Sequence, residues 1–535
     1  MGNKFKYTLL VFFGLAILWS CESELDLKPE DNRQTAASAF EDPEAYRQFL
    51  AKLYAGFAVS GQDGPAGDPD LSGLDEGFSQ YMRLYWKMQE LTTDEAVIGW
   101  NDGTIKDLHS QTWTSGNEFI RTMYSRIMYQ IAQSNEFLRQ TEPGALDSRG
   151  VDDNLRQEID IYRAEARFLR ALSYWHALDL FGNPPFVTEE SPVGAFLPEQ
   201  IQSAELFDYI ESELLAIEST LVAARQHEYG RADKAAAWML LSKLYLNAEK
   251  YSGETRYADV ITYTEKVINA GYGLVDDYQK LFLADNNTNG AQEEVIFPIT
   301  FDGLNTQAYG GLTFVIHASV GGEMNPDDFG INGGWAGLRT TSALVNKFLD
   351  DNDNPIEEVE DERALFFTEG QTKEIEDISS FTDGYAVTKF KNVDVNGNPG
   401  SDPTGDFPDT DFPMFRLADA YLMYAEAVLR GGGGSQQTAI GYINQLRQRA
   451  LGDDNNISAT DLDLDFIIDE RARELYWEAH RRTDLIRFNL FSERGIWPYK
   501  GGVPQGATTE AFRDLMPIPA SDLGVNTNLV QNPGY

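Results

Sequence analysis

Residues 161–187, IYRAEARFLRALSYWHALDLFGNPPFV, decide the fold of this 535-residue chain. Apolar residues recur in this stretch at steps of three or four, which places them on one face of a helix. Gly182 stands where a left-handed cap ends a helix, and neither Pro184 nor Pro185 can continue one. We therefore predict a long amphipathic helix that stops at this glycine. Its apolar face comprises Ile161, Ala164, Phe168, Leu172, Trp175 and Leu178.

Helical spacing recurs along much of the remaining chain. Several of the segments form pairs of 35–40 residues, with small and aromatic residues alternating on the inner face, as in tetratricopeptide-type repeats. A last segment, 465–489, reads as a second long helix whose many charges lie on a solvated face, which we favour over an acid–base role. The sequence thus predicts a mostly α-helical protein. The other predicted helices are 43–58, 118–140, 204–223, 231–249, 256–270, 415–430 and 437–450.

Two regions lack helical spacing and are rich in Gly, Asn, Asp and Pro. Residues 60–77 form a long irregular loop, and such loops in compact proteins often serve a function. Residues 272–413 combine these turn formers with short apolar runs such as VIFPIT, 295–300. We predict loops and a few short strands on the helical scaffold, where binding residues tend to gather. We expect residues 41–535 to form one domain that includes this loop-rich insert.

The composition favours a globular protein and argues against nucleic acid as a partner. Asp and Glu number 85 against 43 Lys and Arg, a formal charge of −42. Binding to phosphates needs clustered Lys and Arg, so neither nucleic acid nor an anionic membrane surface fits as a partner. Because 42% of the residues are hydrophobic and 12% aromatic, the chain can bury a large core.

The N-terminus has the features of a bacterial export signal. Two lysines precede the apolar run 9–18, which is too short for a comfortable transmembrane helix. The single cysteine, Cys21, follows a lipobox-like LWS in which Trp19 replaces the usual small residue. We expect residues 1–20 to be a lipoprotein signal peptide and residues 21–40 a lipidated N-terminus and tether. The alternative is a signal peptide cleaved elsewhere, with a free thiol at Cys21.

Signatures of an enzyme are weak. The five histidines show no paired metal-ligand spacing, and there is neither a G-x-S-x-G motif nor a catalytic cysteine. The adjacent Asp94 and Glu95 could serve a glycoside hydrolase, which needs two acids beside a sugar. Such pairs are plentiful in so acidic a chain. We therefore expect a protein without catalytic activity.

Three aromatic residues in turn-rich sequence favour carbohydrate binding. Trp100 lies in AVIGWNDGT, Tyr309 in TQAYGGLT and Trp335 in INGGWAGL. Neighbouring glycines leave an aromatic face open, and such a face packs against the apolar side of a pyranose ring. A lone Trp is more often a core residue. From the residues alone, a binding surface and a core role are about equally supported.

Several segments resemble the SusD/RagB family of outer-membrane glycan-binding lipoproteins. The resemblance covers nearly the whole mature chain. It implies a SusD-like fold, a lipid anchor at the cell surface and no catalysis. It also implies delivery of the bound glycan to a SusC-like, TonB-dependent outer-membrane transporter, which the protein covers like a lid. The segments are RAEARFLRALSYWHALDLFGNPPF (163–186), GRADKAAAWMLLSKLYLNA (230–248), FPDTDFPMFRLADAYL (407–422) and the tail ending in NPGY.

A starch-binding member of the family is especially similar, which implies starch or malto-oligosaccharides as ligands. The aromatic arc that holds its α-glucan corresponds to three residues here, and its polar contacts correspond to an Asp, an Arg and one of two neighbouring residues. The alternatives are another glycan such as a fructan, a surface glycoside hydrolase, and a structural repeat protein that scaffolds a surface complex. The matching positions are Trp100, Trp335 and Tyr309 for the arc, and Asp75, Arg83 and either Asn101 or Asp102 for the polar contacts.

A structural calcium ion is one reading of a short acidic loop. Asp285, Asn287 and Asn289 precede Gly290 with the spacing of an EF-hand start, but Ile296 stands where the required Glu would be. The resemblance implies a calcium site in this neighbourhood. An Asn-rich turn without an ion is the alternative, and no other cofactor is expected.

Overall fold

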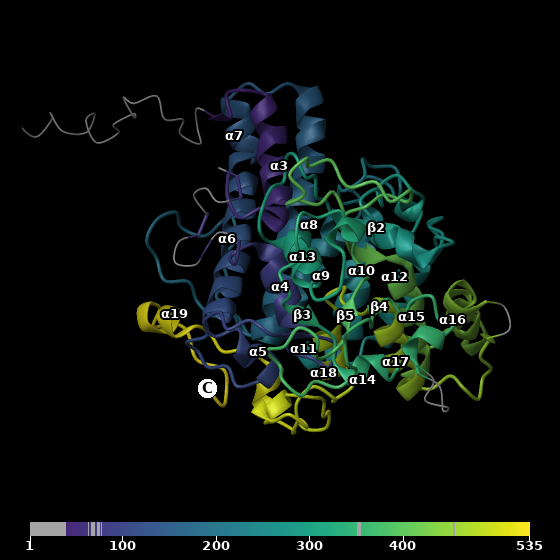
Figure 1. Cartoon of the computed structure of the whole chain (residues 1–535). Coiled ribbons are helices and arrows are strands. Elements are labelled where there is room, and N and C mark those ends of the chain that lie inside the picture. The colour runs from purple at the N-terminus through teal and green to yellow at the C-terminus, as the bar shows by residue number, and fades with distance from the viewer. Residues whose placement is uncertain are drawn as a thin grey trace, which may run out of the picture.

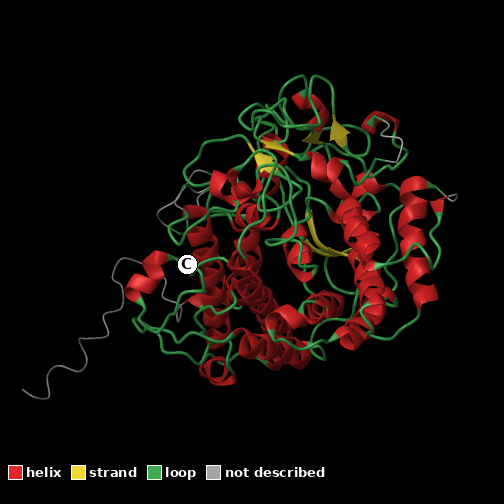
Figure 2. Ribbon diagram, turned by 90° about the horizontal axis from the view of Figure 1, so that it is seen from below, coloured by secondary structure: helices red, strands yellow, loops and turns green. Residues whose placement is uncertain are grey.

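The protein is mostly helical, as the sequence predicts, and its strands are few and short (Figures 1 and 2). In the part of the chain that the computed structural model describes, the strands form three two-stranded antiparallel sheets. The predicted signal peptide, Cys21 and most of the predicted tether lie outside that part. The described residues are 39–62, 64–65, 70–71, 75, 77–349, 355–452 and 455–535.

Helix α8, Asp153–Phe181, is the long helix predicted from residues 161–187. It begins earlier than predicted because the Asp152 carboxylate accepts hydrogen bonds from two backbone N–H groups of the first turn. It ends at Gly182, whose φ of +70° favours glycine. The final turns are buried on all sides. Arg170 is buried there too, where it pairs with Glu213 at 2.7 Å.

Three further helices pack around α8 at the N-terminal side of the molecule (Figure 1). Helices α3, Glu44–Ala58, and α6, Glu118–Gln140, agree with the predicted 43–58 and 118–140. Helix α4, Tyr81–Gln89, was not predicted. All nine of its residues are buried, and they include polar ones such as Arg83 and Lys87. Because these polar residues do not lie on a separate solvent-exposed face, the helix lacks the apolar spacing by which an amphipathic surface helix is recognised.

The remaining long helices pack against one another in succession, on the side of the molecule away from α3 and α6 (Figure 1). Each agrees with a predicted segment within a few residues at most ends, which confirms the tetratricopeptide-type arrangement. They are α9, Ser203–Ile217; α10, Lys234–Leu246; α12, Tyr257–Ile268; α15, Leu417–Leu429; and α16, Gln436–Leu451.

The chain returns to this helical stack after the loop-rich insert. Helix α10 packs against α12, α12 against α15, and α15 against α16, although α12 and α15 are far apart in sequence (Figure 1). Strand β2, Val295–Ile299, covers the first five residues of the predicted VIFPIT run and pairs with β6, Phe412–Arg416. This pairing ties one end of the insert to the other.

The insert also contains a helix that was not predicted. Helix α13, Gly311–Ala318, is buried along its whole length. Its sequence, GLTFVIHA, is a short apolar run, and periodicity cannot separate a buried helix from a buried strand at that length. The short strands of the insert are β3, Leu338–Arg339; β4, Phe366–Phe367; and β5, Ala386–Val387, and β3 pairs with β1, Val97–Ile98, from outside the insert.

The predicted single helix 465–489 is wrong, because the chain breaks between α17, Leu464–Leu475, and α18, Arg481–Arg487. Trp477 and Ala479 have φ values of +63° and +62°, which no right-handed helix contains. Carboxylates of another segment accept the freed backbone N–H groups: Glu95 takes that of Trp477 and Glu90 that of Ala479. Long-range hydrogen bonds thus override the local helical preference.

The charges of this region are buried, which corrects the predicted solvated face. The Arg416 guanidinium on β6 contacts Glu294, Glu474 and Glu478, and all four side chains are inaccessible or nearly so. Removing one partner from such a network leaves an uncompensated buried charge, which costs about 3–5 kcal/mol. These ion pairs therefore fix how the insert, β6 and α17 meet.

The other helices are short. Among the described residues, none of the helices combines the length and the apolar character that crossing a membrane requires. The short α-helices are α5, Lys106–Ser110; α7, Pro143–Ser148; α11, Ala248–Tyr251; α14, Ser342–Val345; and α19, Ala520–Val525.

Candidate functional site

Trp100 and Trp335 meet at the edge of the two-stranded sheet formed by β1 and β3. Trp100 follows β1 by two residues and Trp335 precedes β3 by three, so antiparallel pairing brings them together. Their ring centroids lie 6.3 Å apart and the ring planes are inclined by 45°. The Trp100 indole N–H donates a hydrogen bond to the Trp335 carbonyl at 3.1 Å. Both side chains are half-buried.

Helix α13 supports both rings from below. The Phe314 ring meets the Trp100 ring edge-on, with 5.9 Å between the ring centroids, and the His317 ring stacks on Trp335, with 4.7 Å between the centroids. Their spacing of three residues puts them on one face of the helix. Gly337 allows the close approach, because a Cβ atom there would lie 2.4 Å from the Trp100 ring. The angle between the two indoles is therefore set by packing.

Tyr309 is linked to this pair through a buried cation. Its carbonyl accepts a hydrogen bond of 2.7 Å from Arg83, and the guanidinium carbon lies 4.3 Å from the centre of the Phe314 ring. The Tyr309 ring is half-exposed and packs beside the Phe407 ring, with 5.4 Å between the ring centroids. A Cβ atom at Gly77 would lie 2.6 Å from the Tyr309 Cβ, so the end of the 60–77 loop lies beside Tyr309. We define Trp100, Trp335 and Tyr309 as the aromatic arc.

Acidic residues lie near the same cation. Arg83 is 3% exposed, and burial lowers the pKa of its guanidinium, whereas the charges of Asp75 and Asp102 oppose that shift. Asp75 is exposed and accepts a hydrogen bond from the Gly77 N–H at 3.0 Å. Asn101 is exposed, and Asp102 is half-buried. Of these two neighbours, Asp102 is thus the one whose charge acts on Arg83.

The comparisons with known proteins agree with this fold. A sequence model described as the SusD family matches residues 361–535, and one described as starch-binding, associating with outer membrane, matches residues 74–246. The chain is 39% identical to the starch-binding protein SusD of Bacteroides thetaiotaomicron, over 96% of both chains. The chain belongs to the SusD family.

More distant members share the architecture. SusD-like protein P2 of Formosa agariphila is 26% identical over 83% of this chain and 87% of that protein. The structure of a SusD superfamily protein from Bacteroides thetaiotaomicron superposes with a TM-score of 0.69 at 20% identity, covering 92% of this chain and 99% of that one. Surface glycan-binding protein A from the same organism, in complex with laminarihexaose, gives a TM-score of 0.68 at 19% identity, covering 91% and 99%.

The structure adds residues to the site of this SusD family member that sequence reasoning missed. The guanidinium carbon of Arg83 lies 4.2 Å from the centre of the Phe78 ring and 4.3 Å from that of Phe314. Lys87, one turn further along α4, lies 4.2 Å from the Phe119 ring, and its Nζ has no hydrogen-bond partner among the described residues. Burial lowers the pKa of Lys87, and the Arg83 charge adds to the shift. The sequence signal that could have revealed these residues is the i, i+4 spacing of two cations, Arg83 and Lys87, in an otherwise apolar stretch.

Asp94 and Glu95 do not form an open acid pair of the kind that a glycosidase uses. Both are buried, and Arg481 holds Asp94 with two hydrogen bonds of 2.7 Å. Although burial alone would raise the pKa of Asp94, the charge and hydrogen bonds of Arg481 lower it. Burial raises the pKa of Glu95 to about 7. Their contacts bind the 90–95 segment to α18, which is a structural role.

The 285–290 loop is held by hydrogen bonds within the loop and to neighbouring segments. The Asp285 carboxylate accepts from the Asn289 amide at 3.0 Å and from the Val395 N–H at 3.3 Å. The Asn289 oxygen accepts the N–H of Ala291, while Asn287 is exposed. Within the described residues, no group of three or more His, Cys, Asp or Glu could hold a metal ion. As arranged, these side chains fit a closed turn better than a calcium cage, and the ion stays a prediction.

Proposed function

We propose that this SusD family member binds starch and malto-oligosaccharides at the aromatic arc and has no catalytic activity. In this proposal it is a lipid-anchored protein of the outer-membrane surface. It passes the glycan to a SusC-like, TonB-dependent transporter. The observation that carries the proposal is the inclined pair of half-exposed indoles, Trp100 and Trp335, beside Tyr309.

The shape of the arc favours a coiled glucan. Two indoles inclined by 45° form a bent wall, which suits a polymer that curves, such as an α-1,4-glucan, whereas a flat platform suits a straight chain. The 39% identity to a protein named for starch binding supports the same ligand. The laminarihexaose complex of a 19% identical neighbour indicates that the fold alone does not decide the glycan.

The polar groups play two different roles in this proposal. Exposed Asp75 and Asn101, with half-buried Asp102, contact sugar hydroxyls, and each direct hydrogen bond contributes about 1 kcal/mol. Buried Arg83 instead positions Tyr309 through its carbonyl. Most of the binding energy then comes from the aromatic faces, so we expect modest affinity, with specificity from shape.

Calorimetric titration of residues 22–535 with maltoheptaose, α-cyclodextrin and a fructan tests the choice of glycan. We expect saturable binding of both glucans and none of the fructan. Binding of the fructan alone would preserve the family role and refute the ligand. A reducing-end assay on the same samples should show no cleavage of starch, and cleavage would establish the hydrolase alternative.

The membrane anchor is tested separately. In a Gram-negative host that lipidates exported proteins, the full chain should take up labelled fatty acid and fractionate with the outer membrane. Cys21→Ala should abolish the label. Labelling that persists in this variant would refute Cys21 as the anchor. Co-purification of a TonB-dependent transporter with the membrane-bound protein tests the partner.

A further inference from the structure

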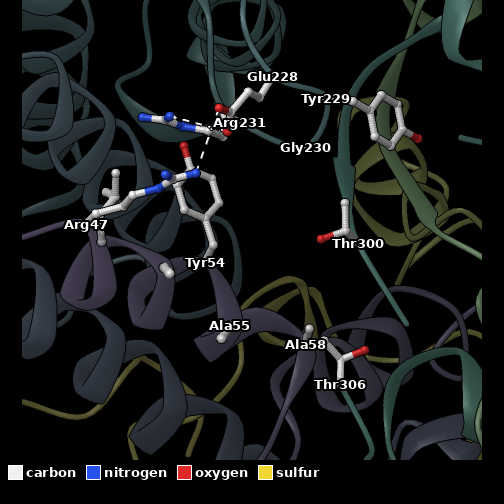
Figure 3. A pocket seen from close by; sticks show the side chains of 12 residues that line it. Arg47, Tyr54, Ala55, Ala58, Glu228, Tyr229, Gly230, Arg231, Thr300 and Thr306 are labelled. Carbon is white, nitrogen blue, oxygen red and sulfur yellow. Dashed lines mark ion pairs between the residues drawn. The ribbon is translucent and has the colours of Figure 1, made fainter. Parts of the chain in front are cut away.

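A second hollow lies apart from the aromatic arc, between α3, the turn 228–231 and the segment 300–306 (Figure 3). Its volume is about 320 Å³, which is near the lower end for small-molecule sites. In Figure 3, Arg47, Tyr54 and Arg231 lie along one side, and Tyr229 and Thr300 face them across the gap. The proposed function uses none of these residues.

The floor of the hollow is apolar and made of small side chains. Ala51, Ala55 and Ala58 follow one face of α3 at steps of four and three residues and line the cavity together with Leu50. Larger residues on this face would fill the space. The floor therefore offers an apolar surface to a ligand of limited size.

An aromatic wall is held in place on one side. Tyr229 is 38% exposed and lines the cavity. Burial and the charge of the Asp411 carboxylate raise the pKa of Tyr229, and the same carboxylate accepts the Phe301 N–H at 2.8 Å. The next residue, Gly230, has a φ of +87°, and a Cβ atom there would lie 2.8 Å from the Thr300 methyl group. The turn 228–231 thus packs closely against Thr300, which follows β2, and this packing positions the backbone that carries the Tyr229 ring.

The opposite wall is polar and equally well fixed. Arg231 donates to the fully buried Glu165 of α8 with its Nε at 3.1 Å, and the Tyr54 hydroxyl donates to the same carboxylate at 2.6 Å. The Arg231 guanidinium also pairs with Glu228 at 3.6 Å, and Glu228 lies 3.9 Å from Arg47. Each cation thus has a carboxylate partner, which disfavours a phosphate or carboxylate ligand.

We propose that this cavity is a second saccharide site, which holds one or two residues of a neutral glycan. The apolar floor and the Tyr229 ring fit the C–H face of a pyranose. Arg231, Glu228 and Thr300 supply the donors and acceptors that sugar hydroxyls need. A purely apolar ligand would exclude water from this polar wall without replacing the hydrogen bonds that water makes to it, which is costly.

The two sites are close enough to serve one polysaccharide. Thr306 lines the cavity and Tyr309 belongs to the arc, and three residues of chain span at most about 11 Å between their Cα atoms. Two contacts on one chain raise the effective affinity without a tighter individual site. The choice of α-glucan as this polysaccharide rests on the proposed function, but the saccharide class does not.

Methyl NMR on the protein labelled at alanine methyl groups tests this site directly. Titration with maltose, and separately with a short fructo-oligosaccharide, should shift the methyl signals of Ala51, Ala55 and Ala58 with a saturable, millimolar dependence. The shifts should persist in Trp100→Ala/Trp335→Ala, which removes the arc. They should vanish in Tyr229→Ala. The shifts of Ala51 and Ala58 should also vanish in Ala55→Leu, which fills the cavity without changing the aromatic wall.

The outcomes separate this inference from the proposed function. Shifts in the arc variant with fructo-oligosaccharide but not maltose would keep the second site and refute an α-glucan as the polysaccharide that occupies both sites. Absence of shifts in the wild type with every saccharide would overturn the second site, whatever the arc binds. Shifts that disappear in the arc variant would also overturn it, because they would report a response of the arc.

Discussion

At the scale of single residues, the shape of the aromatic arc depends on side chains and a glycine that lie behind its rings. Gly337 leaves room for the Trp100 indole, and α13 places Phe314 and His317 beneath the two rings. Lys87 and Arg83 lie among the same phenylalanines. The aromatic arc is therefore a packed surface, and substitutions behind its rings can change its shape.

Gly337→Ala tests this support. The new Cβ would lie 2.4 Å from the Trp100 ring, so the indole must move. We expect calorimetry to show about tenfold weaker maltoheptaose binding, a loss of about 1.4 kcal/mol, with little change in Tm. The matched control is Gly333→Ala, because no atom lies within 4 Å of a Cβ there. Equal affinity of both variants would refute the packing argument.

Lys87→Met tests the buried ammonium. The Lys87 Nζ has no hydrogen-bond partner among the described residues, and burial lowers its pKa, so the charged form is costly in the folded state. Replacement by an apolar side chain of similar length should raise the free energy of unfolding by about 1–3 kcal/mol in denaturant titration. Exposed Lys250→Met serves as the control. A destabilised Lys87 variant would contradict this account.

At the scale of elements, local periodicity accounts for the long helices and fails where distant contacts decide. Helix α8 was predictable because its apolar spacing and its stop signals lie in one stretch. Helix α13 and the two-residue strands β1 and β3 are too short for any periodic signal. The three aromatic residues could be chosen by their glycine-rich surroundings, but their supports come from α4 and α13.

The break between α17 and α18 shows the same limit. Residues 465–489 are helical by spacing, yet Glu90 and Glu95 accept the backbone N–H groups that the break releases. Those carboxylates lie almost 400 residues away in the sequence. A single sequence gives no signal for such a contact, nor for the burial of the charges that appeared to form a solvated face.

Asp94→Asn tests the structural role of the 90–95 segment, which is bound to α18 through Arg481. The variant removes the charge that pairs with buried Arg481 and should lower the free energy of unfolding by about 3 kcal/mol. Maltoheptaose affinity at a temperature where the variant is folded should not change. If instead stability is retained and a starch-cleaving activity of the wild type is lost, Asp94 belongs to an active site and our assignment fails.

At the scale of the whole molecule, the acidic residues fall into an exposed set and a buried set. Exposed carboxylates give the surface its negative charge, while an inner set pairs with arginines along β6, α17 and α18. The charges of Arg363 and Arg473 help to lower the pKa of Glu470 to about 2 against the effect of burial. Glu95 is different, since burial raises its pKa to about 7.

The pH dependence of stability should reveal Glu95. Its folded-state pKa lies above the ordinary value of 4.5, so its contribution to stability is complete below pH 4.5 and is lost as the pH rises through 7. Glu95→Gln cannot lose a proton. Between pH 4.5 and pH 8, its free energy of unfolding should therefore gain about 3 kcal/mol relative to the wild type. Exposed Glu369→Gln should show no such gain, and a flat difference for Glu95→Gln would refute the shift.

The most direct test of the central claim compares maltoheptaose binding by the wild type and Trp100→Ala/Trp335→Ala in parallel calorimetric titrations. Phe196→Ala, which removes an exposed aromatic ring outside the arc, is the control. We predict that the wild type and the control bind alike and that the double variant loses the main binding event, by at least about a hundredfold. Undiminished binding by a folded double variant would contradict the aromatic arc as the glycan site.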